Sequence, residues 1–337
     1  GSAQVAAAVA EGSMADPLSP ETGEAAPQGE VEAETVGSAE AEVPAEEEGE
    51  AIQEVSWDEI RNRLGSGDAR ARLFLQTFEE VYEIDSASAA FAKIKEFLGN
   101  YLIIEFDYKV FCRKLELVSE KDLDDEERWA ACVEKRLAGD LAVAASAMLR
   151  LAATVAKAHS LKMGDWQDIN EACSKAVRLV PTCYRLNRSL PGPLNDARAL
   201  RILPVPTTEA GADLNPWRSE EGRGLFESHH GIEWSHMEIF TAQDGAATSG
   251  FSGAFEVVEV TTMEELCVVR LRALVLGEAP GSFPAKELAE DDSVLWELDG
   301  SLGKLLEPGL VIEGDWYELE SGICFMSSFV SVVPSWA

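Results

Sequence analysis

The sequence predicts an α+β protein with an N-terminal disordered acidic tail, a helical bundle, and then a small β-barrel-like C-terminal domain. Residues 1–54 contain 14 acidic residues and no Lys or Arg, a composition that cannot bury enough apolar surface to fold. Apolar residues then recur at intervals of three and four up to about residue 188, which is typical of amphipathic helices. Beyond residue 224, short β-branched or aromatic runs are separated by Gly, Asp and Pro, which indicates a small barrel or sandwich.

The chain is strongly acidic. Its 337 residues suffice for about two domains, and the formal net charge is −33. Outside the tail there are 47 acidic and 28 basic residues, so we expect the acidity to extend over the whole molecule. This charge repels phosphate backbones and anionic lipids, so no nucleic-acid partner is expected. Membrane insertion is not expected either, because the longest weakly polar run, residues 141–149, is far shorter than the ~20 residues of a membrane span.

The six cysteines show no CxxC spacing and mostly lie in apolar runs. This pattern predicts buried free thiols in a reducing compartment rather than a disulfide framework. The N-terminus shows no basic region followed by an apolar run, so we expect no secretory signal. The location expected from these features is cytoplasmic. The cysteines are Cys112, Cys132, Cys173, Cys183, Cys267 and Cys324.

The helical domain is predicted over residues 55–188. The run Ser56-Trp57-Asp58-Glu59 has the pattern of a capping box that opens the first helix. Residues 101–118 fit either an alternating strand or a helix, and their helical neighbourhood favours the helix. The strongest periodic segment runs from Trp129 to Val155, and Gly139 either splits it or weakens it. Pro181 is expected to kink or end the last helix.

A linker and a β-rich domain are predicted to follow. Residues 189–223 are rich in proline, which indicates a linker in which only residues 199–203 could pair as a strand. The β-rich domain is predicted over residues 224–337, with residues 244–253 as a flexible hairpin loop. Its candidate strands are residues 232–240, 254–260, 265–276, 293–297, 310–312, 316–319 and 323–333.

Part of this domain resembles an SH3 domain. The run Gly314-Asp315-Trp316-Tyr317-Glu318-Leu319, followed by residues 322–330, is similar to the distal half of that family. Ala273-Leu274 stands where the family's ALYDY motif begins, and Glu287, Glu290, Asp291 and Asp292 fall where its RT loop carries acids. The resemblance covers residues 267–334. It implies a small barrel that binds protein partners with basic or proline-containing segments in an aromatic groove.

The sequence also departs from the SH3 pattern. Val275 and Gly277 stand at the ALYDY tyrosines, Met326 at the groove proline and Phe329 at the last tyrosine, so that only Trp316 of the ring set is intact. A degenerate module that uses another surface is therefore an alternative to polyproline binding. A core position for Trp316 and a solvated turn for the acids also stay open. The candidate protein-binding residues are Trp316, Phe329, Met326, Glu290, Asp291 and Asp292.

No motif in the sequence indicates catalysis. There is no phosphate-binding loop and no nucleophile elbow, and His229, His230 and His236 match no closed zinc pattern. We therefore expect no cofactor, no metal and no enzymatic activity. The function predicted is that of a non-enzymatic adaptor or scaffold that binds proteins through a helical domain and a degenerate SH3-like module. The alternatives are an accessory structural subunit of a large multiprotein complex, and an enzyme with its site near the three histidines.

Overall fold

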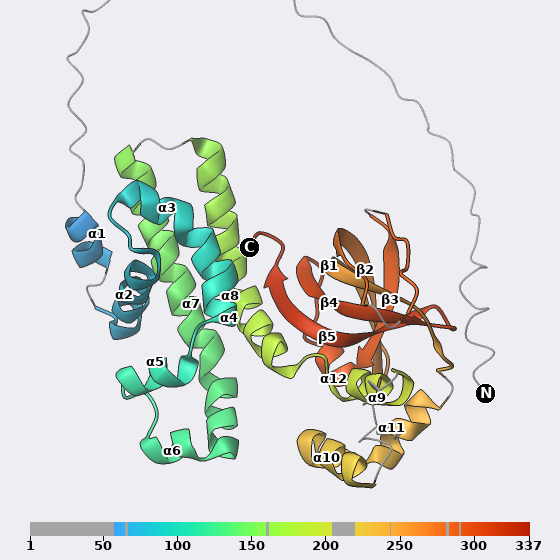
Figure 1. The fold of residues 1–337 in the computed structure, drawn as a ribbon. Coiled ribbons are helices and arrows are strands. Elements are labelled where there is room, and N and C mark those ends of the chain that lie inside the picture. Colours follow the sequence, from blue (N-terminus) through green and yellow to red (C-terminus); the bar gives the residue numbers. More distant parts are fainter. Residues whose placement is uncertain are drawn as a thin grey trace, which may run out of the picture. The chain divides into compact units, whose positions relative to one another are not determined.

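The structure is a computed structural model that describes residues 57–64, 67–159, 162–203, 220–242, 244–280, 283–289 and 291–337. The tail predicted for residues 1–54 and Ser56 of the predicted capping box lie outside these ranges. The chain is α+β, with helices first and a five-stranded sheet at the C-terminal end (Figure 1).

Helical segments follow one another from residue 57 to residue 203, which confirms helices in the region predicted to be helical. Of the ambiguous residues 101–118, residues 101–104 and 108–114 are helical and none is in a strand, which agrees with the favoured helix in those parts. The segments are α1 (Trp57–Leu64), α2 (Ala69–Tyr82), α3 (Ala87–Glu96), the π-helical η2 (Phe97–Tyr101), α4 (Leu102–Ile104), α5 (Tyr108–Lys114), α6 (Glu120–Asp124), α7 (Glu126–His159), α8 (Met163–Ser189) and α9 (Pro193–Ile202). Side chains cap the N-termini of α2, α3, α5 and α6. Asp68 accepts a hydrogen bond from the Arg70 amide at 2.9 Å, and Ser86 accepts one from the Ala89 amide at 3.3 Å.

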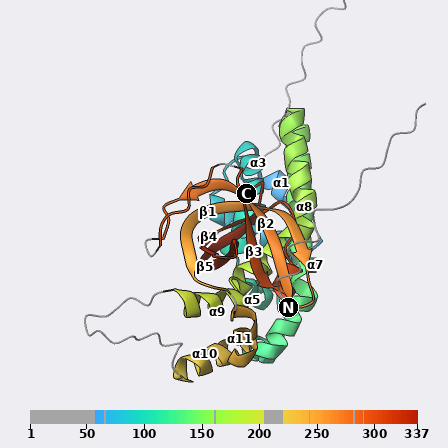
Figure 2. The same ribbon diagram turned by 90° about the vertical axis from the view of Figure 1, so that its right-hand side faces the viewer.

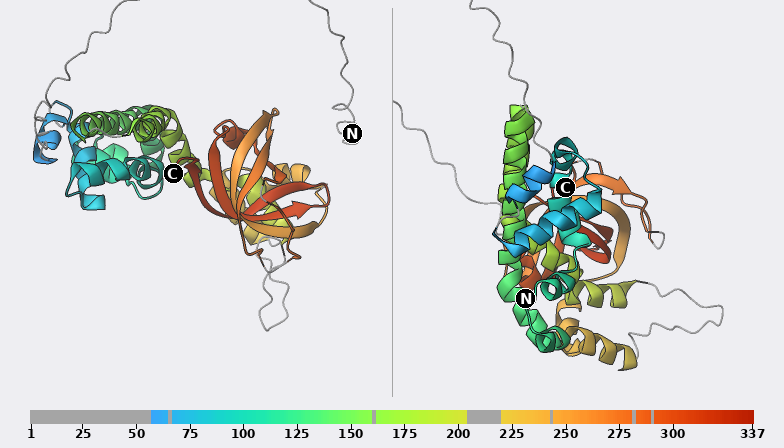
Figure 3. Two further views of the ribbon diagram at one scale, coloured as in Figure 1. Left: turned by 90° about the horizontal axis from the view of Figure 1, so that it is seen from above. Right: turned by 90° about the vertical axis from the view of Figure 1, so that its left-hand side faces the viewer.

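The two long helices, α7 and α8, lie side by side and carry the shorter ones (Figures 1 and 3). Gly139 does not split α7. Pro181 does not end α8, which continues to Ser189. Proline removes the hydrogen bond to the carbonyl four residues earlier. That carbonyl belongs to Val177, which is exposed, so water can take the place of the lost donor.

One helix, α7, is long and apolar enough to cross a membrane when only its length and composition are considered. Half of its apolar window is buried inside the protein, and core helices of soluble proteins pass the same test. The helix also contains Asp140, which is 2% exposed and accepts hydrogen bonds from Tyr108 at 2.6 Å and Arg70 at 3.0 Å. The composition of α7 is therefore weak evidence for a membrane span, and the absence of membrane insertion stays a prediction.

The C-terminal strands form a closed barrel in the order β1-β2-β3-β5-β4 (Figure 2). All neighbours are antiparallel except β3 and β5, which pair in parallel over two residues each. A short helix, α12 (Gly300–Gly303), lies between β3 and β4. The order departs from the chain order only in that β5 and β4 are exchanged. The strands are β1 (Ala247–Thr262), β2 (Leu266–Gly277), β3 (Ser293–Asp299), β4 (Leu310–Leu319) and β5 (Ile323–Pro334).

Two of the predicted strand boundaries are wrong. Residues 247–253, expected as part of a hairpin loop, are the first half of β1 and pair with β4. The strands predicted at 310–312 and 316–319 are one strand, because Gly314 lets β4 pass close to β5. A Cβ at Gly314 would lie 2.5 Å from the Ser328 carbonyl oxygen. The resemblance of residues 267–334 to SH3 domains stays a prediction.

The predicted linker and the predicted strand at 232–240 are helical where the structure describes them. Residues 193–202 form α9, and α10 (Glu220–His230) and α11 (Trp234–Thr241) follow. The strand expected at 199–203 is absent, because the apolar residues on α9 pack on helices and on the barrel end. Ala197 packs with Phe226, Trp234 and Met237 in a separate buried cluster. Figure 2 shows α9 across one end of the barrel, with α10 and α11 beyond it.

Arg198 anchors α9 to the barrel. Its side chain is 1% exposed. The guanidinium donates to Asp244 at 2.8 Å and forms an ion pair with Glu297 of β3. Burial alone would lower the pKa of Arg198, but the two carboxylates raise it above its usual value. The charge is therefore retained, and it holds the helix on the strand.

Two asparagines join the helices to β5. The Asn187 amide of α8 donates to the Val332 carbonyl at 2.6 Å, and its oxygen accepts from the Val332 amide at 3.0 Å. Asn195 of α9 accepts from the Met326 amide at 2.8 Å and from the Trp296 indole at 2.9 Å. Buried apolar residues of the helices and of the barrel belong to one continuous cluster. Residues 51–337 accordingly form one compact unit.

Candidate functional site

Two of the residues predicted to bind a partner are in the barrel core. Trp316 and Met326 are fully buried, and the Trp316 ring lies edge-on to Trp296 with the ring centres 5.2 Å apart. Trp316 and Met326 are opposite each other in β4 and β5, so their side chains share one face of the sheet. That face is the inner one. The prediction that these two side chains form a binding surface is therefore wrong.

The other predicted residues lie elsewhere. Phe329 is half-buried and packs against the core. Asp291 and Asp292 are exposed just before β3, and Asp292 accepts a hydrogen bond from the Ala289 amide at 2.8 Å. Glu290 lies outside the described residues. The described acids form a solvated turn, and the structure does not bring them together with Trp316 and Met326.

The histidines of α10 lie beside two carboxyl groups. His230 Nε2 is 3.0 Å from Asp196 Oδ2 of α9, and the His229 and His230 ring centres are 4.6 Å apart. Asp299, at the end of β3, accepts a hydrogen bond from the Leu194 amide at 3.1 Å. Burial raises the pKa of Asp196 and of Asp299, and burial lowers the pKa of His230. The neutral forms of all three groups are thus favoured by their surroundings.

A cavity of about 330 Å³ adjoins this cluster, with Asp299, His236 and Ser301 in its lining. The His230–Asp196 pair could exchange a proton with a bound molecule. Among the described residues, however, no hydrogen bond joins Ser301 to an imidazole. Nor does the described part of the chain bring three His, Cys, Asp or Glu side chains together around a possible metal position. The cluster therefore lacks an activated nucleophile of the Ser–His type.

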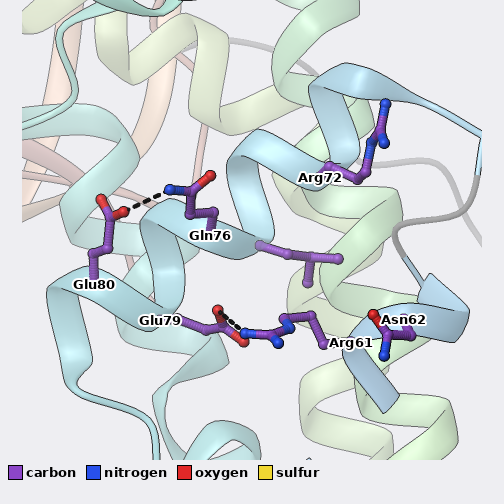
Figure 4. Close-up of a pocket in the computed structure, with 7 residues that line it drawn as sticks. Arg61, Asn62, Arg72, Gln76, Glu79 and Glu80 are labelled. Carbon is purple, nitrogen blue, oxygen red and sulfur yellow. Dashed lines mark hydrogen bonds and ion pairs between the residues drawn. The ribbon is translucent and has the colours of Figure 1, made fainter. Parts of the chain in front are cut away.

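A hollow with a largely polar lining lies between α1 and α2 (Figure 4). Its volume is about 580 Å³. Arg61 is 3.4 Å from Glu79, Gln76 donates to Glu80 at 2.8 Å, and Arg72 points away from the Arg61–Glu79 pair (Figure 4). Two arginines and two glutamates line it, so its formal charges cancel. The hollow offers no excess of one charge.

A smaller groove, with an apolar floor and polar residues around it, lies next to this hollow along α2. Phe106 and Phe111 are buried beneath it, while Val81 and Val110 are 38% and 40% exposed along it. Its volume is about 170 Å³, below the roughly 300 Å³ at which small-molecule pockets begin. We call it the α2–α5 groove. It is lined by Leu73, Thr77, Glu80, Val81, Tyr101, Glu105, Phe106, Asp107, Val110, Phe111 and Lys114.

The rim of the α2–α5 groove is acidic. Glu80, Glu105 and Asp107 line it against one cation, Lys114. None of these four charged groups forms an ion pair with another described residue. The acids also act on Tyr101, which lines the groove. Burial raises the pKa of Tyr101, and the negative charges of Glu105 and Glu80 raise it further. The groove therefore combines an apolar floor with an excess of negative charge, although its Glu80 also lines the hollow beside Arg61 and Arg72.

Charge is unevenly spread over the chain. Residues 57–203, which contain the groove, hold 23 acidic and 22 basic residues, whereas residues 247–334 of the barrel hold 16 and 4. The expectation that the acidity extends over the whole molecule is therefore wrong for the helical part. The acidic rim is a local feature of the groove and not the average of its surroundings.

The groove was not found from the sequence, although a signal was present. Leu73, Thr77 and Val81 recur at intervals of four on α2, which places them on one face of the helix. Phe74 and Phe78, which the core uses, lie next to them on the same side of the helix. The apolar face of α2 is therefore broad, and the core leaves its edge exposed at Val81.

The chain was compared with proteins of known family and known structure. No protein-family model, no curated protein and no solved structure matches the sequence.

Proposed function

We propose that this protein is a non-enzymatic adaptor or scaffold that binds a protein partner through its helical part. The observation that carries the proposal is the α2–α5 groove. Val81 and Val110 are exposed there above buried aromatic rings, and exposed apolar surface with a polar rim is typical of protein interaction sites. The groove is too small to enclose a drug-sized molecule, but it can hold side chains of a partner.

The remainder of the molecule supports this role. The 16 acidic and 4 basic residues of the barrel repel phosphate backbones, so nucleic acid is a poor partner for it. The helices hold the barrel through Asn187, Asn195 and Arg198. The barrel thus serves as a rigid attachment next to the helical binding surface.

A matched pair of substitutions tests the proposal. Val110→Asp places a charge on the floor of the groove, whereas Val177→Asp places one on α8, outside the groove residues, at a valine of similar exposure. Val110 is in the first turn of α5, where a carboxylate is favourable to the helix dipole. Val177 is exposed on α8. Both variants are therefore expected to fold. Proteins recovered on the immobilised full chain should include at least one that V110D loses and V177D retains.

The control is the circular dichroism spectrum, which should be the same for both variants and the original chain. Identical partner sets for the two variants would contradict a role of the groove in binding. So would an absence of any recovered protein with all three chains.

A further inference from the structure

We propose that the segment bound in the α2–α5 groove is basic, with an apolar anchor residue flanked by lysines or arginines. This inference rests on the proposed function and adds the chemistry of the partner. It follows from the composition of the groove, where an apolar floor takes the anchor and three carboxylates on the rim take the cations. One lysine on the rim leaves an excess of negative charge.

The rim carboxylates are available to a partner. The Glu105 carboxylate forms no hydrogen bond or ion pair with another described residue, and the Glu105 amide donates to the Tyr101 carbonyl at 3.1 Å. Glu80 accepts one hydrogen bond from the neutral Gln76 side chain, and Asp107 accepts one from the Val110 amide. Neither interaction neutralises charge. A lysine or arginine from outside would therefore meet an unpaired carboxylate and would not have to displace an existing cation.

The apolar floor favours an anchor side chain. Val81 and Val110 are each more than one third exposed, and Phe106 and Phe111 close the bottom of the groove. An apolar side chain that covers the two valines removes their exposed apolar surface from water, which favours binding. Because the groove measures about 170 Å³, it suits one or two aliphatic side chains rather than a whole ring system or cofactor.

Charge also excludes several other occupants. Residues 1–54 of this chain carry 14 acidic residues and no Lys or Arg, so the rim repels them. A second copy carries a net charge of −33, which opposes self-association through an acidic groove. Anionic lipid headgroups are repelled for the same reason. The occupant that the groove fits is a different protein with a basic, apolar-anchored segment.

The test uses the full chain and two synthetic peptides labelled with a fluorophore. Both peptides carry one central leucine as the anchor, and one has lysines at the flanking positions where the other has glutamates. Fluorescence anisotropy at low salt should show binding of the lysine peptide only. Binding should weaken as salt is added, because the interaction is between exposed charges.

Three variants localise the interaction. V110D should abolish binding of the lysine peptide. Glu105→Gln removes one rim charge without changing the shape of the side chain, and it should weaken binding about two- to fivefold, as expected for an exposed ion pair. Glu134→Gln on α7 also removes an exposed charge, but outside the groove residues, and should leave binding unchanged.

The outcomes separate this inference from the proposed function. Equal binding of both peptides, or binding unaffected by E105Q and by salt, overturns the basic chemistry. Failure of the lysine peptide to bind, while V110D still loses a protein partner that V177D keeps, overturns the basic chemistry and leaves the adaptor function standing. Failure in both experiments overturns both.

Discussion

Asp299 shows how burial sets the charge of a single residue. It is the last residue of β3, and its carboxylate accepts a hydrogen bond from the Leu194 amide in the first turn of α9. Burial raises the pKa of Asp299 above its usual value of 3.8, although this hydrogen bond acts in the opposite direction. The proton is therefore bound more tightly in the folded chain than in the unfolded one. The ionised carboxylate costs stability at neutral pH.

Asp299→Asn should make the protein more stable at pH 7, since asparagine keeps the acceptor and carries no charge. With a raised pKa, the contribution of Asp299 to stability is complete below pH 3.8 and is lost as the pH rises through the folded pKa. The gain in unfolding free energy from D299N should therefore be largest at neutral pH and shrink on acidification. Urea unfolding at several pH values measures it.

Asp124→Asn, at an exposed position on α6, is the control for this comparison. It replaces the same residue type outside the site, so the effect of D299N is measured relative to it. A gain for D299N that grows on acidification would show that the sign assigned to the pKa shift is wrong.

Single residues also show where the sequence was insufficient. Trp316 follows Gly-Asp in a pattern that resembles a surface-presenting hairpin, and yet its ring is fully buried. Alternation along a strand states which residues share a face, but not which of the two faces is the interior. In a closed barrel this depends on strand order and register, which are set by residues far away in the sequence. The position of Met326 was unpredictable for the same reason.

At the scale of elements, Asn187 connects α8 to β5. Its side chain makes two hydrogen bonds to the backbone of Val332, as a neighbouring strand would. Asn187→Ala removes the hydrogen-bond partners of the Val332 amide and of the Val332 carbonyl, and Val332 is buried. We expect the free energy of unfolding to fall by about 1–3 kcal/mol, which is the cost of leaving such groups unsatisfied.

Asn170→Ala, at an exposed position on the same helix, controls for the change of residue type in chemical denaturation. Hydrogen exchange of the Val332 amide gives a local measurement, and it should become faster in N187A but not in N170A. Equal stability of the two variants would show that the Asn187 contacts contribute nothing.

The type of an element was predictable where the element buries one regular apolar face. The helices up to residue 188 and the strands near 265–276, 293–297 and 323–333 were predicted, because each buries one regular apolar face. The segments at 199–203 and 232–240 were predicted as strands and are helical. Their apolar residues are few and pack on one another and on the barrel end, so tertiary contacts override the local pattern.

At the scale of the molecule, the helical part and the barrel share one core. Buried residues from α1 to β5 belong to a single cluster, and residues 51–337 form one compact unit. The sequence left open whether the two parts touch, because contacts such as Asn187–Val332 join residues that are 145 positions apart. Such pairs leave no local pattern in the sequence.

We expect the chain to unfold in one cooperative transition. Far-ultraviolet circular dichroism reports mainly the helices, whereas tryptophan fluorescence includes Trp296 and Trp316, which are fully buried in the barrel. Both probes should give the same midpoint in urea, because loss of either part exposes the shared core of the other. Separate midpoints would show that the two parts are independent folding units.

The second edge of β5 gives the molecule a safeguard against aggregation. This strand meets β3 over only two residues, which would leave much of its backbone open to pairing with a foreign strand. Asn195 and Asn187 take up the amides of Met326 and Val332 on this side, so helices replace the missing neighbour. A barrel without α8 and α9 would expose unpaired backbone groups of β5, which can pair with a strand of another molecule. Excision of the barrel should therefore yield oligomers or fibres instead of a well-behaved fragment.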